Sequence, residues 1–206
     1  MAYTLNLQPF NLIIQAIIAI SVMAVFLSVF IDFMLFSQSN NVRKERKSIV
    51  ETGTMTAFFI AYYFILVSKF GTIGIQSDLA KQLMMILGTV MIVLGCAVNI
   101  KGRFNLGKNW ANQIKIYKEH TLVQTGMYRM VRHPLYASII LMFYGGCLVY
   151  RNIAAFAAVN LIFVPFMYYR AKQEEALLLQ SFPMYEEYKK KTGMLFPMLR
   201  RKDDIK

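Results

Sequence analysis

The chain has 206 residues, of which 57% are hydrophobic and 17% are charged, and it carries a formal net charge of +12. The apolar residues come in long runs and not at the alternating positions of a soluble core, so the composition indicates an all-α integral membrane protein. The basic residues gather between these runs. A membrane face therefore explains the positive charge, and no nucleic-acid partner is needed.

Five apolar runs have about the length of a membrane-spanning helix, which needs roughly 20 residues. They are predicted at Phe10 to Phe36, Thr52 to Ser68, Leu83 to Ile100, Pro134 to Tyr150 and Ile153 to Tyr169. An odd number of spans leaves the two ends on opposite sides of the bilayer. We divide the chain into three N-terminal transmembrane helices (1–100) and a core (101–206) made of a loop, a helical hairpin and a C-terminal segment.

The basic residues orient these spans. All but three of the 23 lysines and arginines follow the first, third or fifth run, and only Lys69, Lys81 and Arg151 lie on the other side. The positive-inside rule then predicts an outside N-terminus and a cytoplasmic C-terminus. A basic cytoplasmic face would also attract anionic lipids.

Cysteine and histidine usage argues against a disulfide and a metal site. Cys96 and Cys147 both fall inside predicted spans, where a thiol is normally a small buried hydrophobe. The two histidines, His120 and His133, do not have the spacing of metal ligands. We expect no metal.

The segment from Lys101 to His133 is predicted to be an irregular loop on the membrane face, with Trp110 as a headgroup anchor. Pro134 favours a helix start, because its fixed φ suits the first turn and its missing N–H costs nothing there. The first amides of that helix would favour an anionic group. Arg129 and Arg132 can equally be simple interfacial anchors.

The two spans of the hairpin are joined by so short a turn that they are predicted to be antiparallel neighbours, with Gly145 and Gly146 allowing close approach. Pro165 should loosen or kink the second of these spans. Beyond it, Arg170 and Glu174 are four residues apart and predict an ordinary surface pair. Glu175 is rotated by about 140° from Arg170, so it can contact a ligand.

Several short motifs occur in one order between Gly102 and Pro197. They are L-G-x-N-W at Leu106 to Trp110, H-x-L-V-x-x-G-x-Y-x-x-x-R-H-P-x-Y at His120 to Tyr136, R-x-x-x-E-E at Arg170 to Glu175, and then F-P-x-Y-x-x-Y and T-G-x-x-F-P. This arrangement resembles the isoprenylcysteine carboxyl methyltransferase family and its phospholipid-methyltransferase relatives. Pro183 stands where that family is expected to have a glycine.

The resemblance implies a methyltransferase that uses S-adenosylmethionine without a Rossmann-type domain, and the chain has no G-x-G-x-x-G loop. It implies a cytoplasmic cofactor site between the loop before the fourth span and the segment after the fifth. The cofactor-binding residues would be His120, Leu122, Val123, Gly126, Tyr128, His133, Tyr136, Glu174 and Glu175.

The resemblance also implies that Arg170 and Glu175 are catalytic. Arg170 would hold the carboxylate of a lipophilic acceptor that enters from the bilayer, and Glu175 would fix the cofactor or Arg170 itself. Three alternatives stay open. A phospholipid or other amine acceptor would need a base, which His133 or Glu175 could supply. An NADPH-dependent membrane sterol or enone reductase and a non-catalytic scaffold are the other two.

Overall fold

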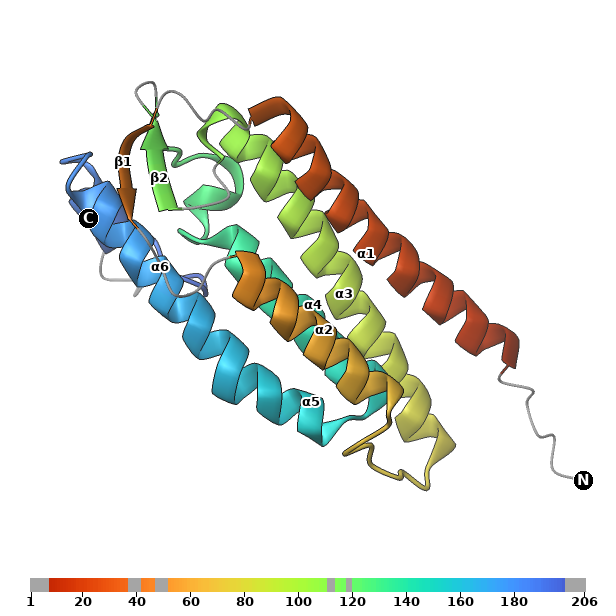
Figure 1. The fold of residues 1–206 in the computed structure, drawn as a ribbon. Coiled ribbons are helices and arrows are strands. Elements are labelled where there is room, and N and C mark those ends of the chain that lie inside the picture. Colours follow the sequence, from red (N-terminus) through yellow and green to blue (C-terminus); the bar gives the residue numbers. More distant parts are fainter. Residues whose placement is uncertain (1–7, 37–41, 47–51, 111–113, 118–119, 199–206) are drawn as a thin grey trace, which may run out of the picture.

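The computed structural model describes residues 8–36, 42–46, 52–110, 114–117 and 120–198, and most of these form a bundle of apolar helices with a common direction (Figure 1). The first three are α1 (Gln8–Phe36), α2 (Thr52–Val67) and α3 (Asp78–Leu106). α4 (Pro134–Tyr150) follows after the loop. A long final helix then runs through α5 (Ile153–Ala158), the π-helical turn η3 (Val159–Phe163) and α6 (Val164–Leu179). Short elements are η1 (Gly107–Asn109), η2 (Gly126–Arg129) and α7 (Tyr185–Lys191).

The long apolar helices coincide with the five predicted runs. Among the described residues, three helices are long and apolar enough to cross a membrane, namely Phe10–Leu35, Asp78–Asn109 and Ile153–Leu179, and two shorter apolar helices are Gly53–Val67 and Pro134–Tyr150. Large apolar side chains such as Leu12 and Ile20 on α1 are 66% and 68% exposed, as expected of a surface that faces lipid. The chain is thus a candidate multi-pass membrane protein. The predicted division at residue 100 falls inside α3.

The fold is helical as predicted, and among the described residues two strands add one small sheet. β1 (Val42–Arg46), which follows α1, pairs antiparallel with β2 (Ile114–Tyr117), which lies inside the segment predicted to be an irregular loop. The sheet lies at one end of the bundle beside α6 (Figure 1). Ile116 is 2% exposed and packs with Leu177 of α6. Pairing between strands so distant in sequence depends on this docking, which local sequence does not encode.

α3 and α4 pack with their backbones in close contact. A Cβ atom on Gly88 would lie 2.5 Å from the carbonyl oxygen of Gly145, and one on Gly95 would lie 2.8 Å from the carbonyl oxygen of Ser138. The prediction that Gly145 and Gly146 serve the contact between the fourth and fifth spans is therefore wrong. Gly145 faces α3, and Gly146 faces the hydroxyl of Tyr62 on α2. A short turn joins two helices but does not decide which helix each packs on.

The turn between α4 and α5 is as tight as predicted. Arg151 adopts a left-handed conformation with φ 50° and ends α4, and Asn152 caps α5 by accepting a hydrogen bond from the Ala155 amide at 2.7 Å. The same asparagine donates to the Phe70 carbonyl at 2.8 Å, which pins the turn to the connection between α2 and α3.

The final helix widens into the π-helical turn η3, which ends at Phe163, two residues before Pro165. Proline cannot donate its backbone hydrogen bond and crowds the preceding turn, so a wider turn at this point is physically reasonable. The helix then continues to Leu179, well beyond the predicted end at Tyr169. Arg170, Glu174 and Glu175 consequently lie on a regular helix.

Candidate active site

α4 begins as the sequence predicts. Pro134 is at its first turn and His133 precedes it with φ −124° and ψ 65°. The His133 ring is buried and stacks on the Tyr136 ring, with centroids 5.4 Å apart and an interplanar angle of 4°. The start of α4 therefore presents two parallel rings, and Tyr136 directs its hydroxyl towards α6.

The hydroxyl of Tyr136 is the point where two side chains of α6 meet. It donates to Oε2 of Glu174 at 2.9 Å and accepts a hydrogen bond from Nε of Arg170 at 3.1 Å. Arg170 is 6% exposed, so the predicted surface location of this arginine is wrong. The Glu174 side chain is 38% exposed and leaves part of its carboxylate accessible. α4 covers this face of α6, which sequence spacing along one helix could not reveal.

Glu175 pairs with Arg132 and not with Arg170. Its Oε1 atom lies 2.7 Å from Nε of Arg132 and 3.4 Å from Nε2 of His133, and the Glu175 side chain is only 2% exposed. Its Oε2 atom is buried and has no hydrogen-bond partner among the residues that the structure describes. A contact with Arg170 is one of the two roles expected for Glu175, beside holding the cofactor, and the structure pairs Glu175 with Arg132 instead.

Arg132 also fastens the C-terminal segment to the start of α4. Its Nη1 atom donates to the carbonyl oxygens of Lys189, at 3.1 Å, and Thr192. Its backbone amide donates to the Gly193 carbonyl at 2.8 Å. Arg132 is 8% exposed, so the alternative in which it is an interfacial anchor is wrong. A guanidinium at the end of α7 also complements the carbonyl groups left unpaired there.

Asn105 near the end of α3 and Asn109 in η1 hold the loop that carries the predicted cofactor residues, and Asn99 of α3 holds the start of α4. Asn109 accepts from the Thr121 amide at 2.8 Å, Asn105 accepts from the Met127 amide at 3.0 Å, and Asn99 donates to Oγ of Ser138 at 2.8 Å. Sequence reasoning missed these roles. The signal for Asn109 was its place in the L-G-x-N-W motif. Asn99 and Asn105 gave none.

Glycine is required beside one of these contacts. Gly126 has φ +60°, and a Cβ atom there would collide with the side chain of Asn105. Trp110, predicted as a headgroup anchor, is instead 6% exposed and packs edge-on against Phe33 of α1 with ring centroids 5.1 Å apart. The loop is therefore packed against helices on both sides.

The charge of Glu174 acts on the loop. Burial lowers the pKa of His120, and the Glu174 carboxylate opposes this shift. Burial raises the pKa of Tyr128 well above its usual value, and Glu174 raises it further. Both loop residues therefore respond to the charge of one carboxylate on α6.

The remaining predicted residues lie on the loop before α4. Leu122 and Val123 are half-buried after the Asn109 contact, and the His120 ring lies 5.9 Å from the ring of Phe182. The structure thus brings together His133, Tyr136, Arg170, Glu174 and Glu175, with His120 and Tyr128 in electrostatic range. In the described ranges, no group of three His, Cys, Asp or Glu side chains could hold a metal ion.

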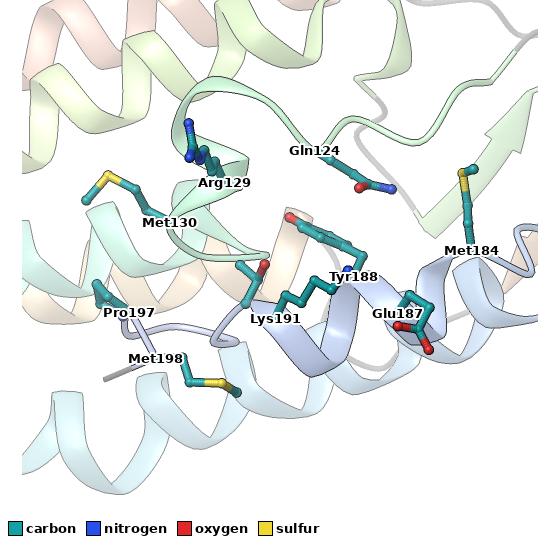
Figure 2. Close-up of a pocket in the computed structure, with 10 residues that line it drawn as sticks. Gln124, Arg129, Met130, Met184, Glu187, Tyr188, Lys191, Pro197 and Met198 are labelled. Carbon is teal, nitrogen blue, oxygen red and sulfur yellow. The ribbon is translucent and has the colours of Figure 1, made fainter. Parts of the chain in front are cut away.

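A pocket of about 510 Å³ opens next to this centre (Figure 2). None of the predicted site residues lines it. The lining residues come from the loop, α7 and the C-terminal segment: Gln124, Arg129, Met130, Met184, Glu187, Tyr188, Lys191, Thr192, Pro197 and Met198. Tyr188 connects the pocket to the site, because its hydroxyl donates to the Tyr128 carbonyl at 2.5 Å.

A cluster of polar residues at one end of an apolar helical bundle is typical of a helical membrane protein whose functional site lies at the membrane interface. Residues 85–180 match the sequence model of the Isoprenylcysteine carboxyl methyltransferase (ICMT) family. The match includes the whole loop before α4, α4 itself and the Arg170–Glu175 segment.

Individual proteins with the same kind of name are similar to this chain. The chain is 32% identical over 127 residues to the protein-S-isoprenylcysteine O-methyltransferase of Saccharomyces cerevisiae, covering 59% of this chain and 52% of the yeast protein. It is 29% identical over 116 residues to a probable protein-S-isoprenylcysteine O-methyltransferase of Oryza sativa subsp. indica, covering 55% and 61%. It is also 30% identical over 116 residues to the cobalt-zinc-cadmium resistance protein CzcN of Cupriavidus metallidurans, covering 55% and 47%. The chain thus spans about half the length of these relatives.

Proposed function

We propose that this chain is an S-adenosylmethionine-dependent methyltransferase that methylates the carboxylate of a lipophilic acceptor, most like an isoprenylcysteine. One observation carries the proposal: Arg170, buried at the end of an apolar bundle, and Glu174, half-exposed, share the hydroxyl of Tyr136. Both lie inside the segment that matches the ICMT family. The similar yeast and rice proteins, a protein-S-isoprenylcysteine O-methyltransferase and a probable one, support the same reaction.

The side chains present fit the proposed cofactor. S-adenosylmethionine carries a sulfonium and an ammonium group, and both suit a carboxylate bordered by aromatic rings. Glu174 supplies the carboxylate, and Tyr136, with His133 stacked on it, supplies the neighbouring rings. When bound, the sulfonium would provide an already activated methyl group. Glu174, Tyr128, His133 and Tyr136 are the residues that would hold it, together with His120, Leu122, Val123 and Gly126 from the loop.

Arg170 is suited to orient an acceptor carboxylate. Its guanidinium can donate directed hydrogen bonds, and Tyr136 fixes its Nε atom at 3.1 Å. A carboxylate is ionised at neutral pH and needs no general base, so positioning is the main task of the protein. The transfer removes one negative and one positive charge. A site that excludes bulk water therefore lowers the barrier to this step.

Glu175 has a supporting role in this proposal. Because Arg132 occupies its Oε1 atom, Glu175 fixes α6 relative to the start of α4, and Glu174 is the acidic residue that faces the cofactor. The site lies on the cytoplasmic side, as the positive-inside rule predicts, and the lipid part of the acceptor enters from the bilayer. The basic residues on that side contact anionic lipids.

The test is calorimetric binding of S-adenosylhomocysteine and, separately, of NADPH to the protein in nanodiscs. The proposal expects micromolar binding of S-adenosylhomocysteine and none of NADPH, followed by methylation of a prenylcysteine analogue. Binding of NADPH alone would favour a reductase instead. Methylation of a phosphatidylethanolamine headgroup but not of the carboxylate would change the acceptor class and leave the cofactor assignment standing.

A further inference from the structure

A network of buried, hydrogen-bonded polar side chains crosses the bundle from α1 to α4. Oδ2 of Asp32 on α1 lies 2.6 Å from Nη1 of Arg103 on α3. Nε of Arg103 donates to Oδ1 of Asn99 at 2.9 Å, and Nδ2 of Asn99 donates to Oγ of Ser138 on α4 at 2.8 Å. All four residues are buried, with Asn99 fully inaccessible.

Burying such a polar network in an apolar bundle costs free energy. Removing a carboxylate and a guanidinium from water costs free energy that their attraction often fails to recover. Elsewhere α1 and α3 pack through apolar contacts, as at Ile14 and Ile92, and through one uncharged hydrogen bond from Cys96 Sγ to the Ser21 carbonyl at 3.3 Å. The ion pair therefore needs a reason other than holding α1 in place.

The polar network ends at the first turn of α4. Ser138 donates to the Leu135 carbonyl at 2.7 Å, and Asn99 reaches the same carbonyl at 3.5 Å. Tyr136 follows Leu135 directly, and its hydroxyl contacts Arg170 and Glu174. These hydrogen bonds thus set how α4 is rotated where it presents Tyr136.

Near Arg103, the polar network is bordered by Trp110 of the L-G-x-N-W motif. The guanidinium carbon of Arg103 lies 5.9 Å from the centre of the Trp110 ring, and Phe33 packs edge-on against the same tryptophan. Asp32 and Phe33 are neighbours on α1, so the last turns of this helix complete the surroundings of Arg103.

We propose that Asp32 is a positioning residue for the methyl transfer, acting through Arg103 and Asn99 on the first turn of α4. This inference rests on the proposed function. α1 lies outside residues 85–180 that match the family, so it extends the working part of the enzyme to the N-terminal helix. The carboxylate holds the guanidinium with Nε towards Asn99, and Asn99 then holds α4. A misplacement of about 1 Å at the reacting groups can cost on the order of 100-fold in rate.

The protein contains its own fluorescent probe of this coupling. Trp110 is the sole tryptophan, and it lies over Arg103. Coupling between two sites is reciprocal. If the polar network influences cofactor binding, then cofactor binding must also change the surroundings of Arg103. S-adenosylhomocysteine should therefore change the fluorescence of Trp110 in the unmodified protein.

The main variant is Asp32→Asn, which removes the charge and keeps the size. We expect kcat to fall at least tenfold with KM for the acceptor within a few-fold, and the fluorescence response of Trp110 to S-adenosylhomocysteine to be lost. The matched control is Asp78→Asn on α3, because Asp78 is exposed and pairs only with Lys81 among the contacts described. Unchanged kcat and an unchanged fluorescence response in Asp32→Asn would overturn the inference.

A double variant separates positioning from simple stabilisation. Asp32→Leu with Arg103→Leu leaves no buried charge, so thermal stability should recover relative to Asp32→Leu alone. The inference expects kcat to stay low, because Asn99 has lost its donor. Recovery of kcat together with stability would show a merely structural pair and overturn it. If the unmodified protein bound no S-adenosylhomocysteine, the proposed function itself would fail, and this inference with it.

Discussion

Nε of Arg132 lies 2.7 Å from Oε1 of Glu175, and the two side chains are 6% and 2% exposed. This contact joins the residue two positions before α4 to the residue on α6 that follows Glu174. Arg132 also holds the carbonyls of Lys189 and Thr192. One guanidinium thus connects three segments that surround the site.

Removing one partner of this pair should destabilise the protein. Arg132→Ala or Glu175→Ala leaves a buried charge without its partner, and the expected loss is about 3–5 kcal/mol in the free energy of unfolding. Thermal or denaturant unfolding in detergent measures it. Glu187→Ala is the control, because it breaks an exposed pair with Lys190 and should leave the unfolding midpoint unchanged. Equal midpoints for all three variants would contradict a structural role.

Arg170 and Glu174 should differ in what they do for the reaction. Arg170→Ala should abolish turnover and leave the affinity for S-adenosylhomocysteine within a few-fold, because this arginine is assigned to the acceptor. Glu174→Gln should weaken cofactor binding, measured by calorimetry, because it removes the facing charge. Lys190→Ala should affect neither. Equal loss of cofactor affinity in the Arg170 and Glu174 variants would assign Arg170 to the cofactor.

The glycine contact between α3 and α4 predicts a clear contrast between two substitutions. Gly88→Ala places a Cβ atom 2.5 Å from the Gly145 carbonyl oxygen, so the helices must separate and the unfolding temperature should fall. Gly53→Ala on α2 meets nothing within 4 Å. It should be neutral or slightly stabilising, because alanine favours helix by up to about 1 kcal/mol over glycine. A Gly88 variant as stable as the Gly53 variant would contradict the close packing.

Acid should destabilise the protein partly through His120. Burial lowers its folded-state pKa below the ordinary value of 6.5, so the unfolded chain binds more protons in the range below about pH 6.5. Stability contributed by the neutral ring is therefore complete above that pH and is lost as the pH falls towards the folded-state pKa. The unfolding temperature of His120→Gln between pH 7.5 and 5.5 should fall less than that of the unmodified protein. An identical pH profile would mean that His120 does not titrate in this way.

Much of the candidate site could be predicted from the sequence. The motifs identified His133, Tyr136, Arg170 and Glu174, and the structure places all four at the junction of α4 and α6. Pro134 marked the start of α4 correctly, because the rules for a proline in the first turn are local. The sequence did not predict the partner of Glu175, which is 43 residues away in Arg132.

The sequence by itself determined the helices, because a backbone in lipid must satisfy its hydrogen bonds within each segment and a long apolar run can do so only as a helix. Tertiary structure alone decided which helices pack together and how each is rotated. Close packing at Gly88 and Gly145 fixes α4 against α3, and that rotation in turn brings Tyr136 to Arg170. Spacing along one helix gives the relative directions of its side chains, but their partners depend on contacts between helices that no local pattern contains.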